Sequence, residues 1–230
     1  MLIFAHRGAS KAAPENSIKA FNLAFKQKAD GIEFDTYQHE SGIVVFHDRT
    51  LARRAREPGY LLDVPWQELS EMDIGEGERI PTLADTLSCV AYDKWCNIEI
   101  KHLNNVDSWV KEVKEAVSQS ALDVDKLLIS SFNHHWLYAI SKRWPEVKIG
   151  ALSASYELDC TASARALEAF SVNIALDAVD KIFVQTALSE GFEVFVYTVN
   201  EPRDMLMLKE WGATGIFTNV PDIALNVLSE

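Results

Sequence analysis

Residues 31–36 read Gly31-Ile32-Glu33-Phe34-Asp35-Thr36, so two carboxylates alternate with apolar side chains in a short run. This period of two is typical of a β-strand whose two faces differ. Another short apolar run, at residues 2–6, comes earlier, and an amphipathic stretch at residues 16–29 lies between the two. A strand, a helix and a strand in this order predict a parallel βαβ unit.

The same alternation continues along the whole chain. Eight apolar runs, each followed by an amphipathic segment, fill 230 residues, which is the number of units and the length of a (β/α)8 TIM barrel, an α/β fold. The main alternative, an open doubly wound sheet, usually has a G-x-G turn after its first strand, and this chain has none there. We therefore predict a barrel. Its expected strands are residues 2–6, 31–36, 96–101, 127–131, 147–152, 172–176, 193–198 and 214–218, and its expected helices are 16–29, 83–92, 106–119, 134–143, 161–169, 180–190, 203–211 and 221–229.

The alternation breaks once, between residues 37 and 80. A further apolar run at residues 43–46 is followed by a polar stretch that is rich in proline and glycine. We expect approximately residues 48–80 to form a small insertion after the second strand, over one face of the barrel. Residues 1–230 are thus expected to form a single TIM-barrel domain.

The chain has a formal net charge of −12 and three cysteines. An acidic protein lacks the basic surface that nucleic acids and anionic membranes require, and no apolar run approaches the length of about 18 residues that a transmembrane helix needs. We therefore expect no nucleic-acid partner and no stable membrane insertion. Cys89, Cys96 and Cys160 have no metal-binding spacing and no signal peptide is recognisable, so we expect reduced thiols in a cytoplasmic protein. The sequence does not indicate an oligomeric state.

Carboxylates mark the ends of two neighbouring predicted strands. Glu33 and Asp35 lie two residues apart, so both point to one side of their strand. Glu99 and Lys101 repeat this spacing in the next barrel strand. These side chains would meet at the carboxyl ends of adjacent strands, where barrel active sites are built. Three carboxylates suit a hard cation, Mg²⁺ or Ca²⁺; the alternative is a buried ion network with Lys101 or Arg7.

Two histidines also end apolar runs. His6 follows the first run and precedes Arg7 and Gly8, and His47 follows residues 43–46. The guanidinium of Arg7 offers a planar set of donors that matches two phosphate oxygens, and Gly8 lets the backbone turn sharply and approach a ligand. Two imidazoles beside a carboxylate cluster suggest an acid and a base for phosphoryl chemistry. The alternative is a strand end whose polar groups are only solvated.

Several motifs follow one another in a fixed order between residue 3 and about residue 222. They are His6-Arg7-Gly8-Ala9, Pro14-Glu15-Asn16-Ser17, Gly31-Ile32-Glu33-Phe34-Asp35, Val44-Val45-Phe46-His47-Asp48, Ile80-Pro81-Thr82-Leu83, Ile98-Glu99-Ile100-Lys101, Ser131-Phe132 and Tyr197-Thr198-Val199-Asn200. Through these motifs the sequence resembles the glycerophosphodiester phosphodiesterase family.

The resemblance implies a barrel with a small inserted segment and one divalent cation. It also implies the hydrolysis of glycerophosphodiesters, which are deacylated phospholipids, to sn-glycerol 3-phosphate and an alcohol. The roles that it implies by position are metal ligands for Glu33, Asp35 and Glu99, an acid–base pair for His6 and His47, with the choice between acid and base left open, and phosphate-binding cations for Arg7 and Lys101.

The chain departs from the family pattern at three places. Asn219 stands where the family often has aspartate, which puts a hydrogen bond at the barrel mouth in doubt. Residues 53–59 lack the usual threonine-glycine run, and Tyr197 replaces a frequent tryptophan while keeping an aromatic wall.

Two other functions compete with this interpretation. A lysophospholipase D-type phosphodiesterase acting on lysolipids would expose an apolar or basic loop. Tyr60, Leu61, Leu62 and Trp66 in the insertion could form such a loop or could seal the barrel mouth. A non-catalytic module that binds phosphorylated polyols would lack acid–base or metal-binding groups, whereas every required position is occupied here.

Overall fold

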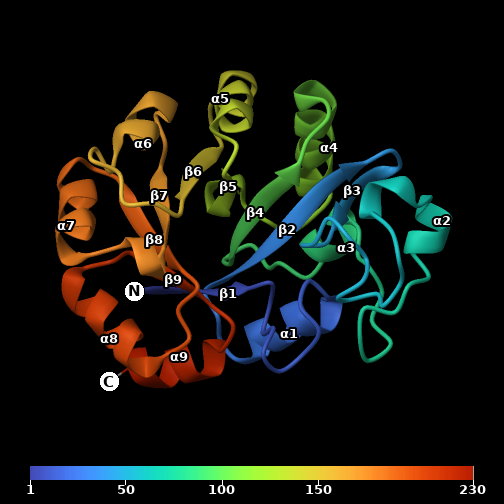
Figure 1. Ribbon diagram of the computed structural model, residues 1–230, viewed down its shortest axis with the longest axis horizontal. Helices are drawn as coiled ribbons and strands as arrows, with labels where there is room; N and C mark the ends of the chain where they lie inside the picture. The colour runs from blue at the N-terminus through green and yellow to red at the C-terminus, as the bar shows by residue number, and fades with distance from the viewer. Residues whose placement is uncertain (230) are drawn as a thin grey trace.

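Nine strands form one sheet, and eight of them close into a parallel barrel in the computed structural model, which describes residues 1–229 (Figure 1). β1 pairs with both β9 and β2, so the sheet has no open end between its first and last barrel strands. The predicted (β/α)8 barrel is confirmed, and the open doubly wound sheet is excluded. In order around the barrel, the strands are β1 (Leu2–His6), β2 (Gly31–His39), β4 (Trp95–His102), β5 (Leu127–Ser131), β6 (Lys148–Ser153), β7 (Ser171–Ala175), β8 (Glu193–Tyr197) and β9 (Gly215–Thr218).

Helices surround the barrel, one after each barrel strand (Figure 1). Two predicted helices were too long. The helix expected at residues 16–29 starts only after Ser17, whose side chain accepts the Ala20 amide, and the one expected at residues 83–92 ends after a single turn and a half. Within residues 1–229 no helix is both long and apolar enough to cross a bilayer. The helices are α1 (Ile18–Lys26), α3 (Leu83–Leu87), α4 (Val106–Ser118), α5 (His134–Arg143), α6 (Ala162–Leu167), α7 (Lys181–Ser189), α8 (Pro202–Trp211) and α9 (Pro221–Leu228).

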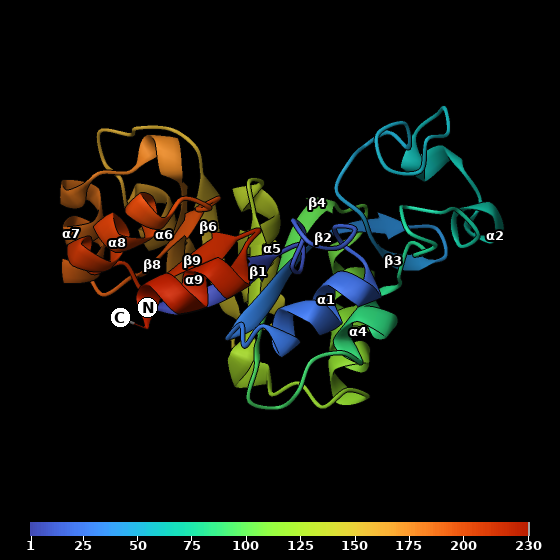
Figure 2. The same cartoon turned by 90° about the horizontal axis from the view of Figure 1, so that it is seen from below.

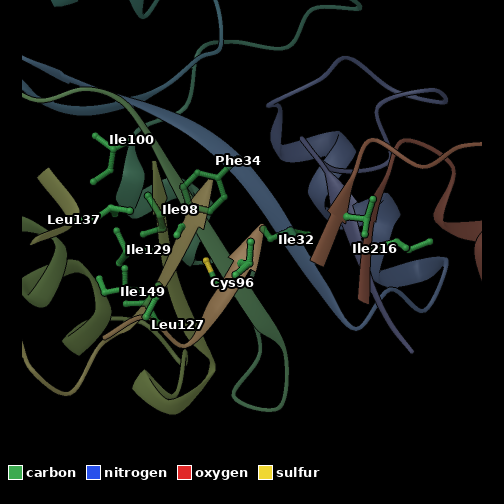
Figure 3. Close-up of a cluster of buried hydrophobic side chains, with 14 of the residues drawn as sticks. Ile32, Phe34, Cys96, Ile98, Ile100, Leu127, Ile129, Leu137, Ile149 and Ile216 are labelled. Atoms are coloured by element: carbon green, nitrogen blue, oxygen red, sulfur yellow. The ribbon is translucent and has the colours of Figure 1, made fainter. Parts of the chain in front are cut away.

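The main hydrophobic core lies between the strands and the helices. Ile32 and Phe34 of β2 belong to it and are fully buried (Figure 3). Because side chains alternate along a strand, Glu33 and Asp35 point the opposite way, into the barrel. The apolar face of β2 thus fixes the register that aims its carboxylates inward.

A second, aromatic cluster fills the interior of the barrel below the polar residues. Phe4 is fully buried, and its ring centroid lies 5.4 Å from that of Phe195 and 5.2 Å from that of Phe217. Gly31 pairs with Phe4, and a Cβ there would lie only 2.6 Å from the Cβ of Trp95. The interior is therefore packed with rings at one end, and its polar chemistry is confined to the carboxyl ends of the strands.

The insertion after the second barrel strand is confirmed. β3 (Gly42–Val45) pairs antiparallel with β2, which extends that strand to residue 39, beyond its expected end. The chain then forms η1 (Leu61–Asp63) and α2 (Trp66–Leu69), to one side of the barrel (Figure 2).

Apolar residues of the insertion pack with residues of β2 and β3 into a small core that is separate from the main one. Leu61 is fully buried, and Leu62 and Trp66 pack partly buried against the same cluster. Only Tyr60, with 54% of its surface exposed, projects outward among the four apolar residues singled out in the sequence. These side chains therefore hold the insertion together and do not form an exposed apolar loop.

We expect Phe4→Leu to lower the free energy of unfolding by about 1–3 kcal/mol, because it removes ring contacts inside a packed barrel. Phe132→Leu is the matched control, since 51% of Phe132 is exposed, and it should cost less than about 0.5 kcal/mol. Urea unfolding followed by circular dichroism measures both. Equal losses would contradict the proposed packing of the interior.

Candidate active site

Strand register brings the three predicted metal-binding carboxylates together. Glu33 lies opposite His6 of β1, and Asp35 lies opposite Glu99 of β4. One oxygen from each carboxylate lies within 4.8 Å of the others, and all three residues are buried. A cavity of about 20 Å³ is lined by His6, Glu33 and Glu99, among others, and that volume suffices for about one water-sized group.

Crowding of the acidic groups changes their protonation. Burial raises the pKa of Glu33 well above its ordinary value, and the charges of Asp35 and Glu99 raise it further. Burial and the charge of Asp35 raise the pKa of Glu99 to about 7. Burial alone would also raise the pKa of Asp35, but the charges of Arg7 and Lys101 hold it below its ordinary value. Protons or a cation must therefore offset the charge of Glu33 and Glu99.

Two basic residues reach this cluster. The Nε atom of Arg7 lies 3.1 Å from Oδ2 of Asp35, and its backbone amide donates to Oε2 of Glu33. The Nζ atom of Lys101 lies 2.6 Å from Oε1 of Glu99 and 3.4 Å from Oδ1 of Asp35. The ion network considered from the sequence thus exists for Asp35 and Glu99.

That network leaves acceptors without donors. Oε1 of Glu33 and Oδ1 of Asp35 are buried and accept no hydrogen bond from residues 1–229, although Nζ of Lys101 forms an ion pair with Oδ1 of Asp35 at 3.4 Å. A buried carboxylate oxygen without a donor costs free energy, and hard oxygen donors are the ligands that Mg²⁺ and Ca²⁺ prefer. The donor set of Glu33, Asp35 and Glu99 therefore fits a divalent cation.

His6 is held by a neutral amide. Its Nδ1 lies 2.7 Å from Oδ1 of Asn219, which also accepts a hydrogen bond from the Ser10 hydroxyl, and its Nε2 lies 4.0 Å from Oε2 of Glu33. Burial, together with the charge of Arg7, lowers the pKa of His6 to about 4. At neutral pH the imidazole is neutral, and we assign the proton to Nδ1 because an amide oxygen can only accept. The doubt about Asn219 is resolved, because asparagine makes the hydrogen bond at the barrel mouth.

His47 is held by a carboxylate instead. Its Nδ1 lies 2.6 Å from Oδ1 of Asp48, and Nη2 of Arg53 donates to the same oxygen at 2.9 Å. The hydroxyl of Tyr37 donates to the His47 carbonyl, and the preceding residue, Phe46, donates its backbone amide to the Asp35 carbonyl at 3.0 Å. The two histidines therefore flank the carboxylates from different segments of the chain.

Gly8 makes the expected sharp turn, and the structure adds a packing reason for it. Its φ of +78° is left-handed, and a Cβ there would lie 2.6 Å from the backbone carbon of Ala20 in α1. The glycine is needed because the turn after β1 packs directly on the first helix.

Sequence reasoning assigned no role to several residues that hold the site. Asn16 is buried with φ +57° and donates Nδ2 to Oδ2 of Asp35 at 2.9 Å. Glu15 accepts hydrogen bonds from Arg7, Arg53 and Arg54. Both belong to the quoted segment Pro14-Glu15-Asn16-Ser17, which was the only signal available for them.

Comparison with known proteins places this geometry in a family. Residues 6–223 match the model of the glycerophosphoryl diester phosphodiesterase family. The chain belongs to this family. The sequence-based resemblance and the expectation of a phosphoric diester hydrolase of this family are therefore confirmed.

Named relatives of the family extend over almost the whole chain. A glycerophosphodiester phosphodiesterase of Caldanaerobacter subterraneus subsp. tengcongensis is 32% identical over 99% of this chain and 97% of its own length. A protein of the same name from Bacillus altitudinis is 28% identical over 99% and 98%. A phosphodiesterase of Oleispira antarctica, solved with the product sn-glycerol-3-phosphate, has a TM-score of 0.92 and 26% identity, and the match covers 100% of this chain and 97% of that one.

The pH dependence of stability should reveal the Glu15 network of this family member. Although burial alone would raise the pKa of Glu15, hydrogen bonds from Arg53 and Arg54 hold it well below the ordinary value of 4.5. A depressed pKa in the folded protein stabilises it above the unfolded value, and this stabilisation is lost as the pH falls through the folded value.

Glu15→Gln should therefore lower the free energy of unfolding at pH 7 by about 1–3 kcal/mol, and the difference from the wild type should shrink as the pH falls below about 4.5. Urea unfolding at pH 7, 5 and 3.5 measures it. Glu40→Gln is the control, because Glu40 is exposed and has no ion pair within residues 1–229. A difference that does not change with pH would contradict the role of the Glu15 charge.

Proposed function

We propose that the protein hydrolyses glycerophosphodiesters to sn-glycerol 3-phosphate and an alcohol, and that one divalent cation, Mg²⁺ or Ca²⁺, is required. The observation that carries this proposal is the convergence of Glu33, Asp35 and Glu99, two of whose buried oxygens accept no hydrogen bond, with His6 Nε2 4.0 Å from Glu33 and His47 directly after the residue that hydrogen-bonds the Asp35 backbone. The named relatives and the product bound to the Oleispira antarctica enzyme support the choice of substrate. We further propose that the chain acts as a single domain and, because its three cysteines are unpaired, in the cytoplasm.

The cation would be held by Glu33, Asp35 and Glu99, and when bound it would polarise a phosphate oxygen and neutralise charge on the phosphoryl group. Arg7 and Lys101 would hold the remaining anionic oxygens. Side chains of both residues are partly accessible from the barrel mouth, with 17% and 20% of their surface exposed. The Nη2 group of Arg7 donates no hydrogen bond within residues 1–229, so it is available to a phosphate oxygen.

The different partners of the two histidines suggest different roles. A carboxylate such as Asp48 stabilises a protonated imidazole, whereas the amide oxygen of Asn219 fixes a tautomer without favouring the added charge. We therefore assign the base to His6, through its free Nε2, and the acid to His47.

In the first step His6 accepts the proton of the glycerol hydroxyl next to the scissile ester. That hydroxyl oxygen forms a bond to phosphorus, the bond from phosphorus to the departing alcohol breaks, and His47 gives that alcohol its proton. Water opens the resulting cyclic phosphate, with the two histidines exchanging roles, and sn-glycerol 3-phosphate is released.

Small water-soluble diesters are favoured over lysolipids by the packing of the insertion. Leu61 is buried, and Leu62 and Trp66 pack against the small separate core. An acyl chain would require an apolar surface that these residues do not present. Comparing glycerophosphocholine with lysophosphatidylcholine tests this preference, and faster hydrolysis of the lysolipid would reverse it.

Removal of divalent cations with EDTA should abolish the release of glycerol 3-phosphate from glycerophosphocholine, and Mg²⁺, Mn²⁺ or Ca²⁺ should restore it to different extents. Binding of the cation to the folded state should also raise the melting temperature. Glu33→Gln should remove both effects, whereas Glu40→Gln should keep them. Hydrolysis that survives chelation would refute the metal-dependent part of the proposal.

The leaving group distinguishes the roles of the histidines. His6→Ala should lower kcat by about 100-fold or more with any alcohol. His47→Ala should do so with glycerophosphocholine, but it should slow the initial release of p-nitrophenolate from a p-nitrophenyl diester of glycerol phosphate much less, because p-nitrophenolate departs without a proton before the cyclic phosphate is opened. His135→Ala, at an exposed position, is the control. The reverse pattern would exchange the two assignments.

A further inference from the structure

A second polar cleft opens beside the active site. It lies between the loop that follows β1 and the insertion, and its volume is about 300 Å³. Lys11 lines it from the loop, Arg54 and Arg56 line it from the insertion, and Glu76 is its one acidic residue. Figure 2 shows the insertion standing to one side of the barrel, next to the chain that leads into α1.

The charges in this cleft are not balanced. Lys11 and Arg56 have no carboxylate within 4.0 Å among residues 1–229, and neither side chain donates a hydrogen bond there. Glu76 is already paired, because its Oε2 lies 2.6 Å from the Nζ of Lys19. Because the chain as a whole has a net charge of −12, we read this local group of cations without carboxylate partners as a place for an anion.

Arg54 adds a donor that has no acceptor. One of its Nη atoms binds Glu15, but its Nε is buried and makes no hydrogen bond within residues 1–229. A buried guanidinium donor without an acceptor costs free energy, so the hydrogen bonds of Arg54 are incompletely satisfied within the protein, and 30% of its side chain is exposed.

The cleft is joined to the active site by shared contacts. Glu15 binds Arg54 on the side of the cleft and Arg7 on the side of the metal-binding carboxylates, at 3.1 Å from Arg7 Nη1. This carboxylate thus contacts a cation of each group. A molecule held by Arg7 at its diester phosphate could therefore extend a second anionic group into the cleft.

We propose that this cleft binds a second phosphate group, carried on the alcohol portion of the substrate. The inference rests on the proposed function and narrows it to glycerophosphodiesters whose alcohol is itself phosphorylated. Phosphate is the anion that best matches the site, because two guanidinium groups and one ammonium can serve its three terminal oxygens. An extended polyanion is excluded by the acidic surface elsewhere.

A matched pair of substrates tests this: glycerophosphoinositol and glycerophosphoinositol 4-phosphate, which differ only in the second phosphate. We expect the wild type to show a kcat/KM about tenfold higher for the phosphorylated substrate. The double variant Lys11→Gln, Arg56→Gln should lose that preference and keep its kcat/KM for glycerophosphoinositol. Lys26→Gln, Lys111→Gln removes the same charge from exposed lysines that have no ion pair within residues 1–229, and it should behave as the wild type.

Inorganic phosphate distinguishes the two possible sources of the ligand. If the second phosphate of the substrate occupies the cleft, free phosphate should inhibit hydrolysis of glycerophosphoinositol 4-phosphate more strongly than hydrolysis of glycerophosphoinositol. This difference should disappear in the Lys11→Gln, Arg56→Gln variant. A wild type without preference, or a double variant that keeps it, would overturn the proposal. The proposal would also be overturned if inorganic phosphate changed the hydrolysis of glycerophosphoinositol alone and this effect required Lys11 and Arg56. That result would indicate a site for free phosphate.

Failure of the proposed function itself would look different, because neither substrate would be hydrolysed. Calorimetric titration with inorganic phosphate in the presence of EDTA then tests whether the cleft binds phosphate. The double variant should bind phosphate about tenfold more weakly than the control pair. Equal affinities would overturn the inference.

Discussion

Repulsion among three buried carboxylates is the constraint on which this structure depends. Parallel strands hold Glu33, Asp35 and Glu99 so close that one oxygen of each lies within 4.8 Å of the others. Arg7 and Lys101 offset the charge of Asp35 and part of that of Glu99, but two oxygens keep no donor. Such an arrangement persists only because the apolar faces of the same strands are packed against helices and cannot turn. The free energy of the hydrophobic core thus maintains a site that would not form by itself.

Local patterns were sufficient to predict the barrel and its acidic cluster. Alternation in β2 sets the direction of Glu33 and Asp35, and parallel register then places Glu99 beside them without further information. Partners from distant parts of the chain were not predictable in the same way. His6 is held by Asn219, which lies 213 residues later, and neither residue's neighbours indicate this contact. The sharp turn at Gly8 was predictable from the sequence, but the close packing of that turn on α1 was not.

The insertion contributes both chemistry and surface. Its apolar residues belong to the small separate core, so its polar residues can face the barrel mouth. Arg53 and Arg54 reach inward to Glu15, while Arg56 stays unpaired within residues 1–229. A short stretch with several arginines can therefore serve two purposes. Some of its members are structural, and others remain available to an anion.

Arg53 contacts Asp48 and Glu15 at once, and these are the neighbours of His47 and Arg7 respectively. His6 belongs to the barrel, whereas His47 follows the hairpin that leads into the insertion. The distance between the two imidazoles, which a phosphorus atom would have to bridge, therefore depends partly on Arg53, together with the Arg54–Glu15 contact and the backbone hydrogen bond from Phe46 to Asp35. Weakening the contacts of Arg53 would make the distance between the two histidines less well defined, although neither imidazole would be changed.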